Sequence, residues 1–335
     1  MATACGNGSG PPTRVVVPAG VGFRTIADSL ERTGMITFPR IFGLYAAARG
    51  RDRSVKPGTY ILRRGSSWNR ILDALAVGRG MVLSVTIPEG WAISQIAPQL
   101  ARMLELPAES LEAAVRDTAL LRELDIPTPT VEGYLFPETY LFPVGTSARG
   151  AIRLMVNEFE RRWTTEQDDR ARALAMSRHD VLALAAIIEK EAKIPEERPV
   201  ISAVYHNRLK KGMLLQADPT VQYAIGQHVA RVLFRHLELD SKYNTYRYKG
   251  LPPGPIASPG SPSIDAALHP ADVPYLYFVA HPDGHHEFRR TFAEHAKAVA
   301  MVRAAARAAR IRAASDSAAR APRPGAAPTG PRTHR

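Results

Sequence analysis

The stretch from Val181 to Tyr223 constrains the fold of this 335-residue chain more than any other. It opens with consecutive apolar residues at 181–188, enough for about two helical turns, and then changes abruptly to Glu189 and Glu191, which flank a lysine. Side chains three, four and seven positions apart share one face of a helix. Glu191 therefore continues the bulkier apolar stripe of this helix, whereas Glu189 continues a stripe of smaller residues on another face.

The two carboxylates are predicted to have different roles. A carboxyl that continues a buried stripe is partly desolvated, and desolvation raises its pKa towards the value that a general acid needs near neutral pH. Glu191 is accordingly the catalytic candidate, and Glu189 is expected to be a supporting residue or the alternative acid. The competing interpretation is a helix that simply ends in solvent, because Pro195 stops it soon afterwards.

The segments after this helix are predicted to line a groove. A second amphipathic helix is expected over 198–209, and the polar run 215–220 follows it between apolar segments. The proline-rich stretch 251–260 fixes its backbone at low entropic cost, which suits a rigid wall of the groove. The residues predicted to bind substrate in and beside these segments are Asn207, Gln216, Asp218, Thr220, Tyr223, Asn244 and Tyr246.

Aromatic and acidic residues are concentrated in the segment 131–143, VEGYLFPETYLFP. Its prolines and aromatic residues favour an ordered loop or a short pair of strands beside a cleft. Aromatic rings can stack on the apolar faces of sugars, while Glu132 and Glu138 can accept hydrogen bonds from hydroxyl groups. Glu138 is a further candidate for substrate binding. Packing of a core would explain the aromatic residues equally well.

The N-terminal part of the chain contains an internal repeat with a spacing of 70 positions. A pattern that includes Gly20 returns around Gly90, and a weaker copy surrounds Gly65. Each copy indicates a short strand, a turn at the glycine and an amphipathic helix. The predicted fold class is α+β. A flexible leader at 1–13 is followed by a small βα module at 14–83 and a mainly helical domain with short strands at 84–300. The basic tail at 301–335 is expected to be disordered.

Composition excludes several classes of protein. Residues 301–335 contain eight Arg and one Asp, so they supply most of the net charge of +12, and the rest of the chain is only mildly basic. No basic stripe with interleaved aromatic residues is present, so no nucleic-acid partner is expected. The histidine spacings match no zinc motif, and neither a metal nor a cofactor is expected. Cys5 is the single cysteine, which excludes a disulfide within the chain. No apolar run is long enough to predict a membrane-spanning segment or a signal sequence.

Several blocks of the sequence resemble one known family. The central blocks are IIEKEA, ERPVISAVYHNRL and GMLLQADPTVQYAIG; VEGYLFPETYLFP precedes them, and YNTYRYKGLPPGPIASPG and ALHPADVPYLYFVA follow. In this order they resemble the endolytic murein transglycosylases of the YceG-like family of peptidoglycan lyases. The resemblance covers roughly Val15 to Val299. It implies that the N-terminal module is LysM-like and that the larger domain is of the lytic-transglycosylase type.

The resemblance also implies a function. Such an enzyme cleaves the β-1,4 bond between N-acetylmuramic acid and N-acetylglucosamine within nascent glycan strands, leaves 1,6-anhydro ends and so terminates elongation. Glu191 would serve as acid and then as base, without consumption of water. The implied partners are peptidoglycan strands and peptidoglycan synthases, and the implied location is extracytoplasmic, at the periplasmic face of the inner membrane. Members of the family associate with the membrane through an N-terminal helix, for which this sequence shows no counterpart.

Two alternatives remain open at this point. A hydrolytic muramidase would use water and require a second acid, for which Glu138 and Asp218 are candidates. A non-catalytic peptidoglycan-binding scaffold would need neither glutamate of the central helix.

Overall fold

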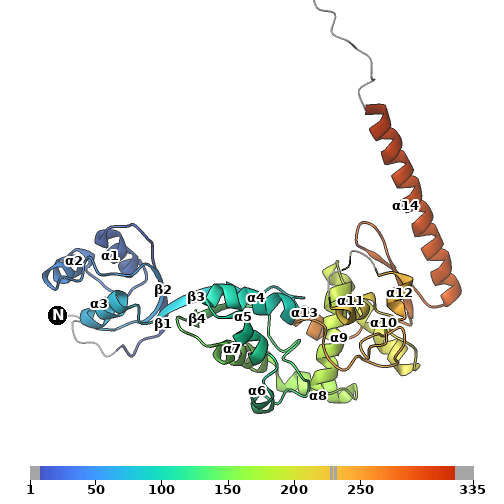
Figure 1. The fold of residues 1–335 in the computed structure, drawn as a ribbon, viewed down its shortest axis with the longest axis horizontal. Helices are drawn as coiled ribbons and strands as arrows, with labels where there is room; N and C mark the ends of the chain where they lie inside the picture. The colour runs from blue at the N-terminus through green and yellow to red at the C-terminus, as the bar shows by residue number, and fades with distance from the viewer. Residues whose placement is uncertain (1–7, 227–228, 230–231, 321–335) are drawn as a thin grey trace, which may run out of the picture.

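The computed structural model describes residues 8–226, 229 and 232–320, the last twelve of these by their backbone alone. It confirms the α+β class, because helices combine with small antiparallel sheets. The molecule is elongated, with the N-terminal module at one end and most helices of the larger domain at the other (Figure 1).

A four-stranded antiparallel sheet joins the two parts of the chain. Its strands lie in the order β1 (Pro12–Val17), β2 (Gly58–Arg63), β3 (Met81–Thr86) and β4 (Thr139–Pro143). Strands β1 and β2 belong to the module, whereas β4 comes from the larger domain and pairs with β3 along its whole length. The predicted domain boundary between residues 83 and 84 therefore falls inside a strand that both parts share.

The units of strand, turn and helix predicted from the repeat are present. Each of the first three strands leads to a glycine with positive φ, namely Gly20 at 72°, Gly65 at 75° and Gly90 at 72°. Residues with a Cβ rarely adopt this conformation, which explains why glycine recurs at the same place in each unit. The helices that follow are α1 (Phe23–Arg32), α3 (Trp68–Val77) and α4 (Ile93–Leu104), and α2 (Pro39–Ala48) is inserted after α1.

Two hydrophobic cores correspond to the two parts of the chain. One core gathers buried residues between Val15 and Leu75, and the other gathers buried residues between Val85 and Leu268. The sheet runs from one core to the other, so β3 connects the module to the larger domain.

Helix α9 (Arg178–Glu191) lies at the centre of the larger domain. The helices that contact it are α8 (Thr165–Ala173), α10 (Arg198–Lys210), α11 (Asp218–Ile225) and α13 (Ser261–Leu268). It contains the helix predicted at 181–188, and α10 contains the one predicted at 198–209. The remaining helical elements here are α5 (Ala108–Ala114), α6 (Thr118–Glu123), α7 (Ala148–Arg162), the 3-10 turn Pro195–Glu197 and α12 (Phe234–Leu237). A two-stranded sheet consists of β5 (Tyr277–Ala280) and β6 (His286–Arg289).

The last helix, α14 (Phe292–Arg320), projects away from the larger domain (Figure 1). Of the segment 301–335, for which we predict disorder, residues 301–320 are helical, because alanine-rich sequence has a high helix propensity. Residues 321–335, and most of the predicted leader at 1–13, lie outside the described residues. Within the part of the chain that the structure describes, no helix combines the length and apolar character needed to cross a bilayer.

Candidate functional site

Helix α9 delivers two carboxylates to its C-terminal end. Its first turn is fixed by a capping box, in which the Ser177 hydroxyl accepts from the Asp180 amide at 3.1 Å and Asp180 accepts from the Ser177 amide at 2.9 Å. Residues 181–188 are at most 1% exposed. Because this rigid, buried helix ends at Glu191, the positions of both glutamates are set by the core rather than by a loop.

Glu191 faces a polar cluster formed with α10. The Tyr205 hydroxyl donates a hydrogen bond of 3.1 Å to Glu191 Oε1. Part of Glu191 stays accessible to solvent, yet protein surrounds its carboxyl, and this burial raises its pKa to about 7, with the negative charge of Asp218 adding to the effect. Tyr205 and Arg208 oppose the rise. A carboxyl with such a pKa can both donate and accept a proton near neutral pH.

Glu189 faces a different set of groups. Its Oε2 accepts hydrogen bonds from the Ser263 hydroxyl at 2.6 Å and from the Gly260 amide at 3.2 Å, and Arg198 lies 3.9 Å from Oε1. The side chain is 8% exposed. Glu189 thus fastens the end of α9 to the start of α13, and its hydrogen-bonding capacity is largely used within the protein.

Arg208 is a site residue that the sequence interpretation missed. It is 7% exposed, and its Nε and Nη1 donate to the carbonyl oxygens of Leu276 at 2.6 Å and Leu215 at 2.7 Å. Its guanidinium lies 5.1 Å from the ring centre of Tyr277. The signal was present in the helical spacing, because Tyr205 and Arg208 are three positions apart on α10 and share a face.

Gln216 and Asp218 come from the segment that Arg208 holds. Gln216 is exposed and has φ of +50°, a conformation that costs a residue with a Cβ about 1–3 kcal/mol. Its backbone N–H donates to the Thr245 carbonyl oxygen at 3.1 Å, which holds this conformation in place. The Tyr246 hydroxyl donates to Asp218 Oδ1 at 2.6 Å, and Asp218 and Glu191 both help to raise the pKa of Tyr246, after burial.

We call Glu191, Tyr205, Arg208, Gln216, Asp218 and Tyr246 the Glu191 site. It combines one carboxyl with a raised pKa, a second carboxylate near it and exposed side chains that can reach a ligand. No group of metal-binding side chains occurs among the described residues.

Three residues predicted to bind substrate have internal partners instead. The Asn207 amide donates to the carbonyl oxygens of Val273 and Tyr275, and the Asn244 amide donates to those of Leu237 and Leu239. Asn244 and Thr220 are fully buried, and the Thr220 hydroxyl donates to the Ala217 carbonyl at 2.7 Å. These side chains position the segments around the site, and Asn244 and Thr220 are not accessible to a ligand.

Glu138 and Tyr223 do not belong to the Glu191 site. Glu138 forms an ion pair with Arg162 of α7 and accepts from the Thr139 amide at 2.9 Å. The ring of Tyr223 lies 4.8 Å from that of Tyr243, and its hydroxyl is hydrogen-bonded to Glu132.

Glu132 is a second carboxyl with a raised pKa. It is 5% exposed and accepts from the Ile93 amide at 3.0 Å, at the start of α4. Burial raises its pKa to about 7. The carboxyl therefore caps a helix N-terminus, where a negative charge is favourable, but within a desolvated environment that favours the neutral form.

Replacing Glu132 with Gln should make stability less dependent on pH. Because the folded pKa is raised above its ordinary 4.5, the contribution of Glu132 is complete below about pH 4.5 and is lost as pH rises through about 7. We expect Glu132→Gln to gain up to about 3 kcal/mol relative to the original chain between pH 5 and 8. Urea unfolding at several pH values measures this, with exposed Glu112→Gln as control. A difference in the free energy of unfolding between Glu132→Gln and the original chain that stays constant from pH 5 to 8 would contradict this prediction.

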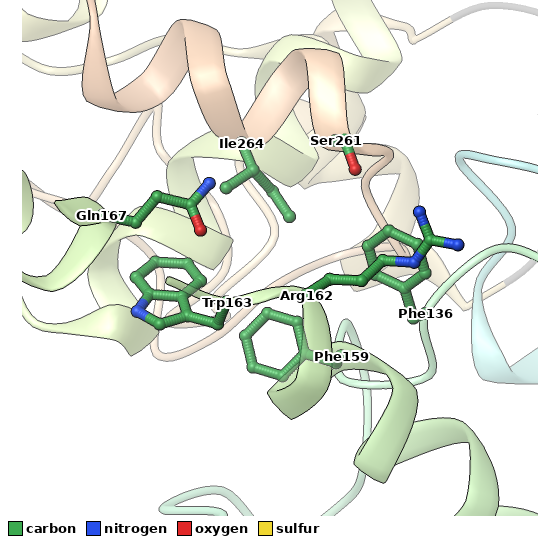
Figure 2. A pocket seen from close by; sticks show the side chains of 7 residues that line it. All are labelled: Phe136, Phe159, Arg162, Trp163, Gln167, Ser261 and Ile264. Carbon is green, nitrogen blue, oxygen red and sulfur yellow. The ribbon is translucent and has the colours of Figure 1, made fainter. Parts of the chain in front are cut away.

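A small pocket lies between α7, α8 and α13 (Figure 2). Its aromatic side chains, Phe136, Phe159 and Trp163, are 5%, 2% and 8% exposed, so they pack inside the domain. This supports the packing interpretation for Phe136 in the segment 131–143. The residues that line the pocket, none of which was predicted as a site residue, are Phe136, Phe159, Arg162, Trp163, Gln167, Ser261 and Ile264.

Comparisons with known proteins agree over most of the chain. A model of the YceG-like family matches residues 15–301. The endolytic murein transglycosylase of Bacillus subtilis (strain 168) is 36% identical over 298 residues, which cover 84% of this chain and 82% of that protein. The endolytic murein transglycosylase of Streptococcus pneumoniae (strain D39) is 28% identical over 297 residues, covering 79% of this chain and 54% of the streptococcal protein, so this chain spans about half its length.

A solved structure points in the same direction. The crystal structure of a YceG-like protein from Listeria monocytogenes matches with a TM-score of 0.61 and 33% sequence identity, covering 86% of this chain and 99% of that one. The match to the family model extends over both parts of the chain, and the matched range contains the residues of the Glu191 site. The chain belongs to the YceG-like family.

Proposed function

We propose that this protein is an endolytic peptidoglycan lytic transglycosylase with Glu191 as its catalytic residue. The single observation that carries the assignment is the carboxyl of Glu191, which has a pKa of about 7 and lies beside Tyr205 and Asp218 at the end of a buried helix. The names of the Bacillus and Streptococcus relatives support murein as the substrate.

The reaction requires one carboxyl that works twice. Protonated Glu191 donates its proton to the glycosidic oxygen as the bond from C1 of N-acetylmuramic acid to that oxygen breaks, and the leaving N-acetylglucosamine gains a 4-hydroxyl. The Glu191 carboxylate then takes the proton of the muramyl C6 hydroxyl, whose oxygen bonds to C1. The product is a 1,6-anhydro end, Glu191 is protonated again and no water is consumed.

The rest of the proposal follows from this reaction. Cleavage within nascent strands would terminate their elongation, with peptidoglycan synthases as partners and an extracytoplasmic location at the periplasmic face of the inner membrane. We assign the N-terminal βα units to a LysM-like module and the domain around α9 to the lytic-transglycosylase type. The exposed side chains of Gln216 and Asp218 are the substrate-binding residues that the geometry favours.

Digestion of isolated glycan strands tests this function. An endolytic enzyme shortens the average strand early in the digestion and releases few disaccharides, whereas an exolytic enzyme releases disaccharides from the start. Binding to strands without any shortening would favour the scaffold alternative.

One observation favours a hydrolytic muramidase as the second candidate. Asp218 is close enough to Glu191 to raise its pKa, so a second acid is present at the site. Glu138, the other candidate for that role, is paired with Arg162 of α7. Hydrolysis would depend on Asp218 as the base that activates water.

Tyr205→Phe should move the alkaline limb of the activity profile to higher pH. Activity that requires protonated Glu191 falls as pH rises through about 7, and the hydrogen bond from Tyr205 lowers the pKa of this carboxyl. Removing this hydrogen bond therefore raises the pKa of Glu191, and cleavage persists to higher pH. Initial rates between pH 5 and 9 measure the shift, with Tyr248→Phe as a control on an exposed hydroxyl. An unchanged limb, or one at lower pH, would contradict the proposed role of Glu191.

A further inference from the structure

Helix α2 of the N-terminal module has an exposed apolar face. Ile41 and Leu44 are 55% and 74% exposed, and Phe38, immediately before the helix, is 51% exposed. Phe42 and Ala46, on the opposite side of the helix, are fully buried in the core of the module. Clustered apolar side chains on a surface indicate an interaction site more strongly than isolated ones do. The described part of the chain provides nothing that covers this face.

Arginine residues border the apolar face. At 100° per residue, Ile41, Leu44 and Ala48 point in nearly one direction, and Arg40 and Arg49 lie on either side. The Arg49 guanidinium lies 5.0 Å from the ring centre of Tyr45, which places one cation beside the face. Residues 31–56 contain six Lys or Arg and two acidic residues.

We propose that this face of α2 binds the surface of a bilayer that contains anionic lipid, with the helix lying parallel to the surface. An apolar face bordered by cations is the pattern of helices that lie in the membrane interface. Lipid headgroups pair with the arginine residues, while Ile41 and Leu44 enter the acyl boundary.

Two other occupants fit the face less well. A soluble polyanion would contact the arginine residues but leave Ile41 and Leu44 in water. A second copy of the chain would bring two sets of arginine residues together, and like charges at an interface are unfavourable. Helix α2 lies at the end of the molecule remote from α9 (Figure 1), so this inference is independent of the proposed function.

An environment-sensitive fluorophore at position 44 tests the proposal in the full chain. Leu44→Cys in a Cys5→Ser background carries the label, and Val144→Cys, at a position that is 54% exposed beyond β4, carries it in the control. Vesicles of phosphatidylcholine with phosphatidylglycerol should shift the emission at position 44 to shorter wavelength and leave position 144 unchanged. Vesicles of phosphatidylcholine alone should have little effect.

Sedimentation with the same vesicles gives a second measurement. We expect the double variant Ile41→Ser and Leu44→Ser to lower partitioning at least about tenfold, and the control pair Val77→Ser and Val144→Ser to leave it unchanged. Unaltered sedimentation together with an unresponsive label would place binding on another basic segment and overturn the proposal. A shift at position 44 that depends on protein concentration without vesicles would assign the face to self-association and also overturn it.

Discussion

Glu191→Gln should lower the rate of glycan cleavage by about 10²- to 10⁴-fold, the usual contribution of a general acid. Glutamine can still accept the hydrogen bond from Tyr205, but it cannot donate a proton to the glycosidic oxygen or take one from the C6 hydroxyl. The fold should be retained because Gln has nearly the same shape and removes a carboxyl that burial destabilises in its charged form. Initial rates on isolated glycan strands, with the thermal midpoint measured in parallel, test this.

Glu189→Gln is the matched comparison, because it makes the same chemical change two positions earlier on the helix. Glu189 accepts hydrogen bonds from Ser263 and Gly260. Its replacement should therefore lower mainly the stability of the fold, through the contact between α9 and α13. Loss of activity in a well-folded Glu189→Gln protein, with Glu191→Gln near the original rate, would reverse the assignment.

Gly133→Ala is expected to have the largest effect on stability, about 2–5 kcal/mol. Gly133 has φ of +79°, which costs a residue with a Cβ about 1–2 kcal/mol. A methyl group would also overlap the ring of Pro255 and lie 3.3 Å from the Ala257 carbonyl oxygen, and overpacking of this kind adds about 1–3 kcal/mol. Here the segment 131–143 meets the proline-rich wall 251–260 directly.

Gly145→Ala separates the two causes. Gly145 has φ of +83°, but nothing lies within 4 Å of an added Cβ, so only the backbone cost applies. Thermal or urea unfolding should therefore show a clearly larger loss for Gly133→Ala than for Gly145→Ala. Equal losses would mean that the contact with Pro255 relaxes without cost.

The sequence predicts α9 well because the apolar run at 181–188 is rich in leucine and alanine, which have high helix propensity. The same reasoning separates Glu189 from Glu191, since a rigid helix directs residues two positions apart to different sides. The structure gives the two carboxyls different neighbours, Ser263 and Tyr205 respectively.

The sequence pattern could not distinguish polar side chains that face a ligand from polar side chains that form hydrogen bonds to the backbone. Asn244 and Thr220 lie in polar segments, as Gln216 does, but their side chains donate to backbone carbonyl groups a few residues earlier in the chain, those of Leu237 and Ala217. Arg208 was missed although it shares a face of α10 with Tyr205, because the carbonyl groups that make its burial possible come from two other segments.

The measurement that tests the central claim most directly is digestion of glycan strands in water enriched in ¹⁸O, followed by mass spectrometry of the products. If Glu191 closes the 1,6-anhydro ring, the products are one water lighter than hydrolysis products and carry no ¹⁸O. Products of full hydrolytic mass that contain ¹⁸O at the new end would contradict this claim and would favour a muramidase, for which Asp218 is the candidate base.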